Sequence, residues 1–316
     1  MLRIVALLFS ILVAVPALAE DFPGSQPIKI VVPFAPGGTT DLLGRVVAEF
    51  LQKQMNHTII VENRPGAATL IGTDAMAKSA PDGHTVLLAA ADLAVLPGMR
   101  RNLPYDIEKF TYLTRFFVNL PLIVTGPNSD ISSLEDLVAK IKANPGKYKH
   151  ATNGVGSLTH FGSLKFDAAI GGKTVAVPYG GQGPGSIDTI SGTVAFQHGA
   201  SVPLAPGLRV LGPSGNRRHP EYPNLPTMAE LGYKNADWSA WFGFVAPPDT
   251  PKPIADRLIK EINTVLKEPE LIEKLRTAAK WVPETNPLTG DDFKKLVLDD
   301  LKSWKEIAER ENLVVQ

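Results

Sequence analysis

The chain has 316 residues, 32 basic and 32 acidic side chains, 44% hydrophobic residues and no cysteine. The zero net charge offers no electrostatic footprint for nucleic acid or for an anionic membrane surface. The lack of cysteine excludes a disulfide scaffold, a thiolate zinc site, an iron–sulfur cluster and a cysteine nucleophile. This length fits one large domain or two ordinary ones, with enough apolar content for real cores.

Residues 1–19 have the features of a secretory signal peptide. Arg3 supplies a positive n-region, the stretch from Ile4 to Val15 is apolar, and Ala17-Leu18-Ala19 is a small-residue cleavage site. The alternative, a membrane anchor, needs about 20 apolar residues, and this run is shorter. An exported chain without cysteine is more typical of a bacterial periplasm than of a disulfide-rich pathway. We therefore predict export to the periplasm with cleavage after Ala19.

The first third of the mature chain alternates short apolar runs with amphipathic helices, which is typical of a parallel α/β sheet. We expect strands at 28–32, 58–61 and 85–89. The apolar spacing of residues 43–51 predicts the first helix, and a second helix is expected at about 69–79.

The middle of the chain repeats this alternation. A first crossing between domains is expected at 122–127, and the capping box Ser132-x-x-Glu135 predicts a helix after it. Further helices are expected at about 158–169 and after Gly180-Gly181. Further strands are expected at 148–152, 174–178, 194–196 and 208–211.

The apolar run 241–245 is the second expected crossing, and the rest of the chain is expected to be helical. Thr250 and Pro251 suit the N-cap and first positions of a helix. We therefore predict an α/β fold of two lobes, residues 20–122 with 240–316 and residues 123–239, joined by two crossing segments.

A glycine-rich loop is expected between the first strand and the first helix. It reads Ala35-Pro36-Gly37-Gly38-Thr39-Thr40-Asp41. Helix N-termini carry unpaired N–H groups and a partial positive charge, so such a loop favours a bound anion. The alternative is an ordinary strand-to-helix turn in which Thr40 or Asp41 caps the helix.

Two further loops of this kind are expected in the second lobe, 153–160 and 178–184. They are rich in backbone donors and poor in lysine and arginine. Loops at the carboxyl ends of strands favour one shared site between the lobes, where amide dipoles and hydroxyl groups hold a small anion. His198 lies near these loops in the sequence and is included as a candidate.

Other sites are excluded or less favoured. Gly154-x-Gly156 lacks the third glycine of a dinucleotide fingerprint, and the histidines lack metal-ligand spacing, so neither cofactor nor metal is expected. An exported hydrolase remains an alternative, with Ser157 or Thr159 as nucleophile and His160 as base, although no third orienting group is apparent.

The sequence resembles the Bug family, which comprises TctC-like solute receptors of tripartite tricarboxylate transporters. The matching motifs are Ile28 to Asp41, Val61 to Ala67, Ala80 to Thr85, Leu103-Pro104-Tyr105-Asp106, Val177-Pro178-Tyr179, Leu225-Pro226-Thr227 and Trp241-Phe242-Gly243. They extend over nearly the whole mature chain.

The resemblance implies a type II-like, Venus-flytrap periplasmic binding protein that closes on a carboxylate. It also implies that main-chain amides of the first loop hold the ligand's carboxylate, often through waters, and that the short turn after the third strand faces the cleft. The expected ligand-binding residues are Ala35, Pro36, Gly37, Gly38, Thr39, Thr40, Asp41, Ala91, Asp92, Asn153, Gly156, Ser157, Thr159, His160, Tyr179, Gly180, Gly181, Gln182 and His198.

The sequence departs from the family pattern after Phe196, where the acidic residue that faces the ligand is absent. A di- or tricarboxylate or an aromatic carboxylate is therefore favoured over an amino acid. The expected partners are this small carboxylate and the membrane subunits of the transporter, with no nucleic acid, and the receptor is expected to be a monomer. Signalling to a sensor partner is the alternative output.

Overall fold

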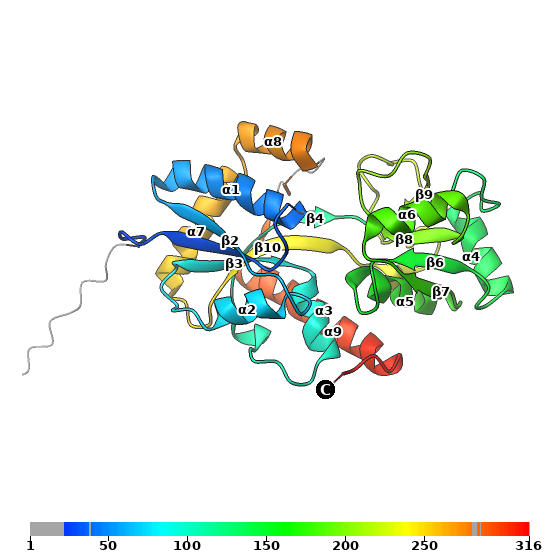
Figure 1. Cartoon of the computed structure of the whole chain (residues 1–316), viewed down its shortest axis with the longest axis horizontal. Coiled ribbons are helices and arrows are strands. Elements are labelled where there is room, and N and C mark those ends of the chain that lie inside the picture. Colours follow the sequence, from blue (N-terminus) through cyan, green and yellow to red (C-terminus); the bar gives the residue numbers. More distant parts are fainter. Residues whose placement is uncertain (1–21, 38, 280–282, 285, 316) are drawn as a thin grey trace, which may run out of the picture.

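A computed structural model describes residues 22–37, 39–279, 283–284 and 286–315. The predicted signal peptide and Gly38 lie outside the described residues. The described chain forms two α/β lobes, each built on its own sheet, and they stand side by side in Figure 1. This is the predicted two-lobed fold class.

The first lobe is built on a six-stranded sheet. Its strand order is β11 (Leu288–Thr289), β4 (Thr111–Asn119), β10 (Ala240–Ala246), β3 (Thr85–Ala90), β1 (Ile28–Val32) and β2 (Ile59–Asn63). Its helices are α1 (Thr39–Met55), α2 (Leu70–Ala77), α3 (Asp92–Met99), α7 (Lys252–Val265), α8 (Pro269–Ala279) and α9 (Gly290–Arg310). The sheet is mixed rather than purely parallel, because β10 returns from the second lobe and runs antiparallel to β3 and β4.

The second lobe is built on a five-stranded sheet. Its order is β7 (Val175–Pro178), β6 (Lys149–Thr152), β8 (Phe196–Ala200), β5 (Leu122–Thr125) and β9 (Arg209–Pro213). Its helices are α4 (Leu134–Ala143), α5 (Leu158–Ile170) and α6 (Gln182–Ser191), with a short 3-10 turn at Lys234–Ala236. This sheet is mixed too, since β5 pairs antiparallel with β8 and β9.

The crossings lie a few residues before the expected positions. Residues 122–125 form β5 inside the second sheet, and residues 241–245 belong to β10 inside the first. The chain therefore passes between the sheets at 120–121 and again at 237–239. Asn119 and Ala240, the residues at the two strand ends, are paired partners in the ladder, so the crossings leave from adjacent points.

Two helix starts also differ from expectation by one residue. Ser133, not Ser132, is the N-cap of α4 and accepts a hydrogen bond from Asp136 N. Pro251 is the N-cap of α7, and the Thr250 hydroxyl donates instead to Pro247 O. In both cases an alternative local hydrogen bond moves the cap along the chain.

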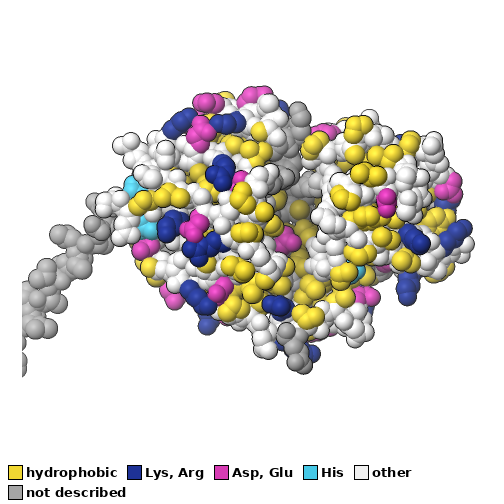
Figure 2. Space-filling view, viewed as in Figure 1, with side chains coloured by type: hydrophobic (Ala, Val, Ile, Leu, Met, Phe, Trp, Pro, Cys, Tyr) yellow, Lys and Arg dark blue, Asp and Glu magenta, His cyan; other side chains and the backbone are white. Residues whose placement is uncertain are grey.

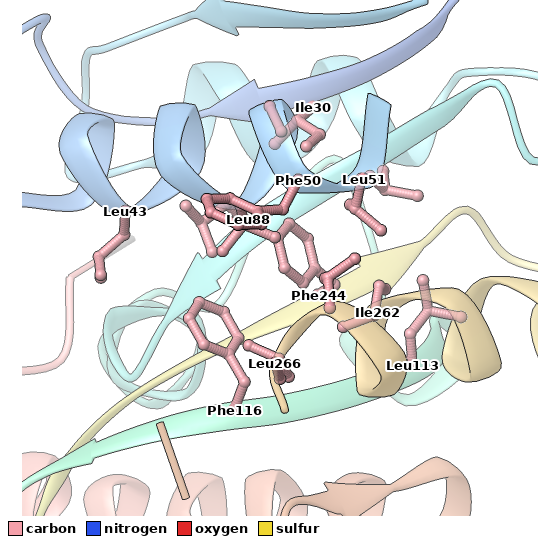
Figure 3. Packing of buried hydrophobic residues seen from close by; sticks show 14 of the residues in the cluster. Ile30, Leu43, Phe50, Leu51, Leu88, Leu113, Phe116, Phe244, Ile262 and Leu266 are labelled. Carbon is pink, nitrogen blue, oxygen red and sulfur yellow. The ribbon is translucent and has the colours of Figure 1, made fainter. Parts of the chain in front are cut away.

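The first sheet has an apolar core on each face. Along β1, Ile30 packs on the α1 side and Val31 on the opposite side, as the two-residue period of a strand requires. Figure 3 shows the first of these clusters, in which the stacked rings of Phe116 and Phe244 lie 5.3 Å apart. Full burial of such a side chain contributes about 1.5–3 kcal/mol.

The cluster on the other face extends into the second lobe. Leu158 and Phe161 of α5 are buried in it together with Trp304 of α9, and the rings of Phe161 and Trp304 meet edge to face at 6.0 Å. Helix α5 of the second lobe thus packs directly on the first lobe.

Candidate functional site

The first predicted loop joins β1 to α1, and α1 begins on the side of its lobe that faces the other lobe (Figure 1). Ala35, Pro36 and Gly37 are exposed, and Gly37 has φ +83° with no atom within 4 Å of the position that a Cβ would take. Thr40 is buried in the first turn of α1. The loop therefore presents its backbone to open space at a helix N-terminus.

Asp41 organises this loop from within. Its carboxylate accepts hydrogen bonds from Gly37 N (2.9 Å), Arg45 Nε (3.0 Å) and Asn63 Nδ2 (2.9 Å). The Arg45 hydrogen bond is the largest cause that lowers the pKa of Asp41 to about 2. Asn63 also donates to Phe34 O, which ties the loop to the end of β2. The Asp41 side chain thus fixes the backbone of the loop.

The turn after β3 stands beside the crossings. Ala91 is buried and its N–H donates to Trp241 O (3.0 Å) at the start of β10. Asp92 is half-buried as the first residue of α3, and desolvation raises the pKa of its carboxyl group. Asp92 therefore places an acid with a raised proton affinity at the carboxyl end of the first sheet.

The loop 153–160 is held by its own side chains. Asn153 N donates to Thr159 Oγ1 (2.9 Å), and the Ser157 hydroxyl donates to Gly154 O (2.7 Å) while capping α5 at His160 N. A Cβ on Gly156 would lie 2.8 Å from Met99 Cε, so this loop meets the end of α3 across the lobe boundary. The structure thereby brings the second predicted loop against the first lobe.

The same contacts argue against a Ser–His pair. His160 Nδ1 accepts from Gly156 N (3.2 Å), and the Ser157 hydroxyl is directed at a carbonyl oxygen rather than at the imidazole. Desolvation lowers the pKa of His160. A nucleophile needs a base within hydrogen-bond reach of its proton, and this geometry instead builds a helix cap.

The third loop, 179–182, leads from β7 into α6. Gly180 and Gly181 have no atom within 4 Å of an added Cβ, and the Tyr179 hydroxyl donates to Asp188 (2.6 Å). Gln182 is engaged twice by the backbone of Ser201, donating from Nε2 to O (2.7 Å) and accepting at Oε1 from N (2.9 Å). The Gln182 side chain therefore joins the start of α6 to the end of β8.

His198 lies in the core of the second lobe. It is buried in the second lobe, where its ring contacts Phe166 and stacks on Trp238 at 5.8 Å. Desolvation holds the pKa of His198 well below its usual value. Strand β8 lies inside its sheet and all five of its residues are buried, so a histidine there enters the core.

Sequence reasoning missed the residues that support the loops. Arg45 and Asn63 hold Asp41, while Asn119 donates to Ser201 Oγ across the lobe boundary. Met99 contacts the second loop. Most of these partners are distant in sequence from the residues that they contact. Arg45 is the exception, because its i,i+4 spacing from Asp41 on a helix predicts that the two side chains are neighbours.

The surface is hollowed between the lobes in the view of Figure 2. Within the described ranges, no three His, Asp or Glu side chains form a group that could hold a metal ion. The helices of those ranges also include none that is long and apolar enough to cross a membrane. The loops at the carboxyl ends of β1, β3, β6 and β7 are thus the candidate site, built mainly from backbone.

Known proteins match the chain over most of its length. The profile of the "Tripartite tricarboxylate transporter family receptor" matches residues 43–313. Protein BugT of Bordetella pertussis is 34% identical over 308 residues, which cover 94% of this chain and 92% of BugT.

Solved structures are also similar to this chain over most of its length. The periplasmic binding protein BugD is 28% identical, with a TM-score of 0.72 over 92% of this chain and 99% of that one. R. palustris Rpa4515, solved with adipate, is 25% identical, with a TM-score of 0.73 over 92% of this chain and 98% of that one.

Proposed function

The chain belongs to the tripartite tricarboxylate transporter family of receptors, and from this premise we propose that it captures a small carboxylate between its lobes and delivers it to membrane subunits of such a transporter. We propose the two lobes predicted above, with the first boundary moved to the start of β5, so that they are residues 20–121 with 240–316 and residues 122–239. The proposed site is made of the loops 35–41, 91–92, 153–160 and 179–182.

One observation carries the proposal: helices α1, α5 and α6 all begin at glycine-containing loops that follow sheet strands. Gly37, Gly154 and Gly181 adopt positive φ there, at +83°, +116° and +148°. A positive φ lets the main chain turn its N–H groups toward a ligand without a side chain in the way. Convergent amide donors at helix N-termini suit a carboxylate.

The ligand class follows from what the loops lack. None of the proposed loop residues is lysine or arginine. The hydroxyl groups of Ser157 and Tyr179 donate within the second lobe, so backbone amides remain the main donors. Each charge-assisted hydrogen bond contributes about 1.5–3 kcal/mol. A di- or tricarboxylate or an aromatic carboxylate is therefore proposed, and the adipate bound by a relative belongs to this class.

The polar residues after Phe196 support a plain acid rather than an amino acid. Gln197 stands there, and its side-chain oxygen accepts from Ser186 (2.9 Å) inside the lobe. An amide engaged in this way offers no counter-charge to an ammonium group.

Export is part of the proposal. We infer that the signal peptide is cleaved after Ala19 and that the mature receptor is a periplasmic monomer. Mass spectrometry of protein released from the periplasm would give an N-terminus at Glu20, and a different first residue would contradict the assigned cleavage site.

The binding proposal is tested with a panel of acids. Thermal shift followed by titration calorimetry, with adipate, malate, citrate, benzoate and glutamate, is expected to show stabilisation by one or more of the first four. A ligand at 100 times its Kd adds about 2.7 kcal/mol to the free energy of unfolding. Stabilisation by glutamate alone would overturn the assignment of a plain carboxylate.

The site itself is tested by adding bulk. Gly180→Val places a side chain in open space, so it is expected to weaken binding of the identified acid at least tenfold with an unchanged melting temperature. Thr193→Val, exposed beyond the far end of α6, is the matched control. Uptake by cells with and without the transporter's membrane subunits separates delivery from sensing, because a receptor for a sensor binds without supporting uptake.

A further inference from the structure

A cavity between the lobes lies away from the proposed ligand loops. It has a volume of about 860 Å³, and its walls come from α5 and the segment 234–239 on one side and from β4 and α9 on the other. None of the proposed ligand residues lines it. We name this cavity the α5–α9 groove.

The groove and the ligand loops lie on opposite sides of the crossings. In the strand order of the first sheet, β10 separates β4 from β3 and β1. The proposed ligand loops of the first lobe follow β1 and β3, whereas the groove takes Arg115 from β4. A rotation about the crossings that brings the ligand loops together therefore moves the walls of the groove apart.

The second-lobe wall of the groove is basic. It carries Lys165, Arg217 and Lys234 against one acid, Asp237. Lys165 is half-buried, and its Nζ donates to Ser303 Oγ of the first lobe at 3.3 Å. Among the described residues, none of these three cations lies within 4 Å of a carboxylate oxygen, the distance that defines an ion pair.

The first-lobe wall is acidic. Its two cations are already paired, Arg115 with Glu284 (2.7 Å) and Arg310 with Glu311 (2.8 Å). Asp300 and Glu306 remain, and Asp300 accepts from Trp241 Nε1 (2.9 Å) at the floor. Asp299 also lines the groove and is paired with Lys295.

The opposite charges attract across the lobe boundary. Desolvation lowers the pKa of Lys165, and the charge of Asp300 acts against it by raising that pKa. Burial raises the pKa of Asp300 to about 6, and the charge of Lys165 acts to lower it. Each charge thus favours the ionised form of the other across the lobe boundary. Unlike charges on the two walls favour a narrow groove, and a narrow groove corresponds to an open ligand cleft.

We propose that the α5–α9 groove is an electrostatic restraint that favours the open state of the ligand cleft and thereby weakens ligand binding without touching the ligand. The apparent affinity for a ligand that binds only the closed state is the intrinsic affinity multiplied by the fraction of molecules that are already closed. A smaller closed fraction therefore weakens binding. Lys165 and Asp300 are positioning residues in this sense. The proposal rests on the proposed function only in that the lobes rotate, and not on which ligand binds.

The test uses the ligand-free protein. Because the chain has no cysteine, Gln54→Cys on α1 and Asn128→Cys after β5 give one exposed spin-label site in each lobe. Lys165→Gln and Asp300→Asn are each expected to raise the closed population about threefold, seen as a smaller radius of gyration in X-ray scattering and as altered weights in the double electron–electron resonance distance distribution. Salt at 0.5 M is expected to move the wild type in the same direction.

The controls separate the restraint from a general loss of charge or of stability. Lys305→Gln and Glu309→Gln change exposed α9 residues outside the groove and are expected to leave both measurements unchanged. The double variant Lys165→Gln/Asp300→Asn is expected to lose the salt response. The proposal is overturned if the single variants match the wild type or if the wild type does not respond to salt. Neither outcome depends on carboxylate binding, so a failure of the proposed function remains distinguishable.

Discussion

Asp41 shows how one side chain sets the shape of a proposed binding loop. Three donors converge on its carboxylate, and the side chain is only 6% exposed. The stability linked to its pKa of about 2 is present above pH 3.8 and is lost as the pH falls toward 2. Arg45 is half exposed, so solvent screening reduces this contribution.

We predict that Asp41→Ala lowers the free energy of unfolding by about 1–2 kcal/mol at pH 7 and weakens ligand binding more than tenfold, because the backbone of the loop loses its anchor. Urea denaturation and calorimetry measure the two effects. Asp256→Ala removes an exposed i,i+4 partner of Lys252 and is expected to change either quantity little. Equal binding by Asp41→Ala and wild type would contradict the role given to Asp41.

Replacing Asp92 is expected to strengthen ligand binding, whereas replacing Asp41 is expected to weaken it. Its carboxyl group belongs to the proposed site, where desolvation raises its pKa and where ionisation would oppose a bound carboxylate. Asp92→Asn is therefore expected to tighten binding of the identified acid about threefold to tenfold in calorimetry at pH 7. A weaker binding constant would show that Asp92 accepts a hydrogen bond that the ligand needs.

His150 and His198 predict sensitivity to acid. Both are buried, and neither ring has a hydrogen-bond partner among the described residues. Burial lowers the pKa of His150 from 6.5 to about 3. Between these pH values the unfolded chain binds a proton at His150 and the folded lobe does not. Through His150 the free energy of unfolding should fall by up to about 1.4 kcal/mol per pH unit as the pH drops from 6.5 toward 3, and the lowered pKa of His198 adds a fall of the same sign.

His150→Phe is expected to flatten this decline, since the aromatic contact with Phe196 is kept while the titrating group is removed. Chemical denaturation at pH 7, 5.5 and 4 measures the slope. His57→Gln, which changes a histidine outside this core, is the control. An unchanged slope in His150→Phe would contradict the assignment.

At the scale of an element, α5 is shaped by what it packs against. A Cβ on Gly162 would lie 2.3 Å from the Trp238 ring, so the helix approaches the second crossing as closely as it does only because that residue is glycine. Gly183 in α6 has no atom within 4 Å of an added Cβ. The two helical glycines therefore form a matched pair.

Gly162→Ala is expected to lower the free energy of unfolding by about 1–3 kcal/mol through overpacking, although alanine is the better helix former. Gly183→Ala is expected to raise the free energy of unfolding by up to about 1 kcal/mol, because alanine lowers the entropy of the unfolded chain and meets no steric obstacle at this position. Thermal denaturation of the two variants tests the pair, and the same sign in both would contradict the packing described.

The elements that sequence reasoning missed share a physical cause. Strand β4 contains Arg115, which a pattern assigns to the surface, yet its charge is buried because Glu284 reaches it from 169 residues away. Helix α3 contains Pro97 and Gly98, which disfavour a helix, but Gly98 is needed for close packing on Trp304 of α9. Tertiary contacts override local preference at both places.

The predictable parts are those with local causes. The loops at strand ends, the start of α5 near residue 158 and the amphipathic face of α1 follow from neighbouring residues in the sequence. The inward turn of His198 and the support of Asp41 by Asn63 depend on which strands become neighbours, and no local spacing encodes that.

At the scale of the whole molecule, the two lobes are linked in more than one way. Besides the crossings, α5 packs on α9 through Phe161 and Trp304, and Asn119 bonds Ser201 across the boundary. The relative position of the lobes is therefore set by apolar, polar and charged contacts together.

The pairing of Asn119 with Ala240 limits which movements are available. Two attachment points that sit side by side on hydrogen-bonded antiparallel strands define a single axis. Turning about that axis leaves the ladder of β4 and β10 intact, because the ladder lies entirely in the first sheet. A rotation about this axis is therefore the movement that we propose for ligand capture and release, and it would also loosen the packing of Phe161 on Trp304.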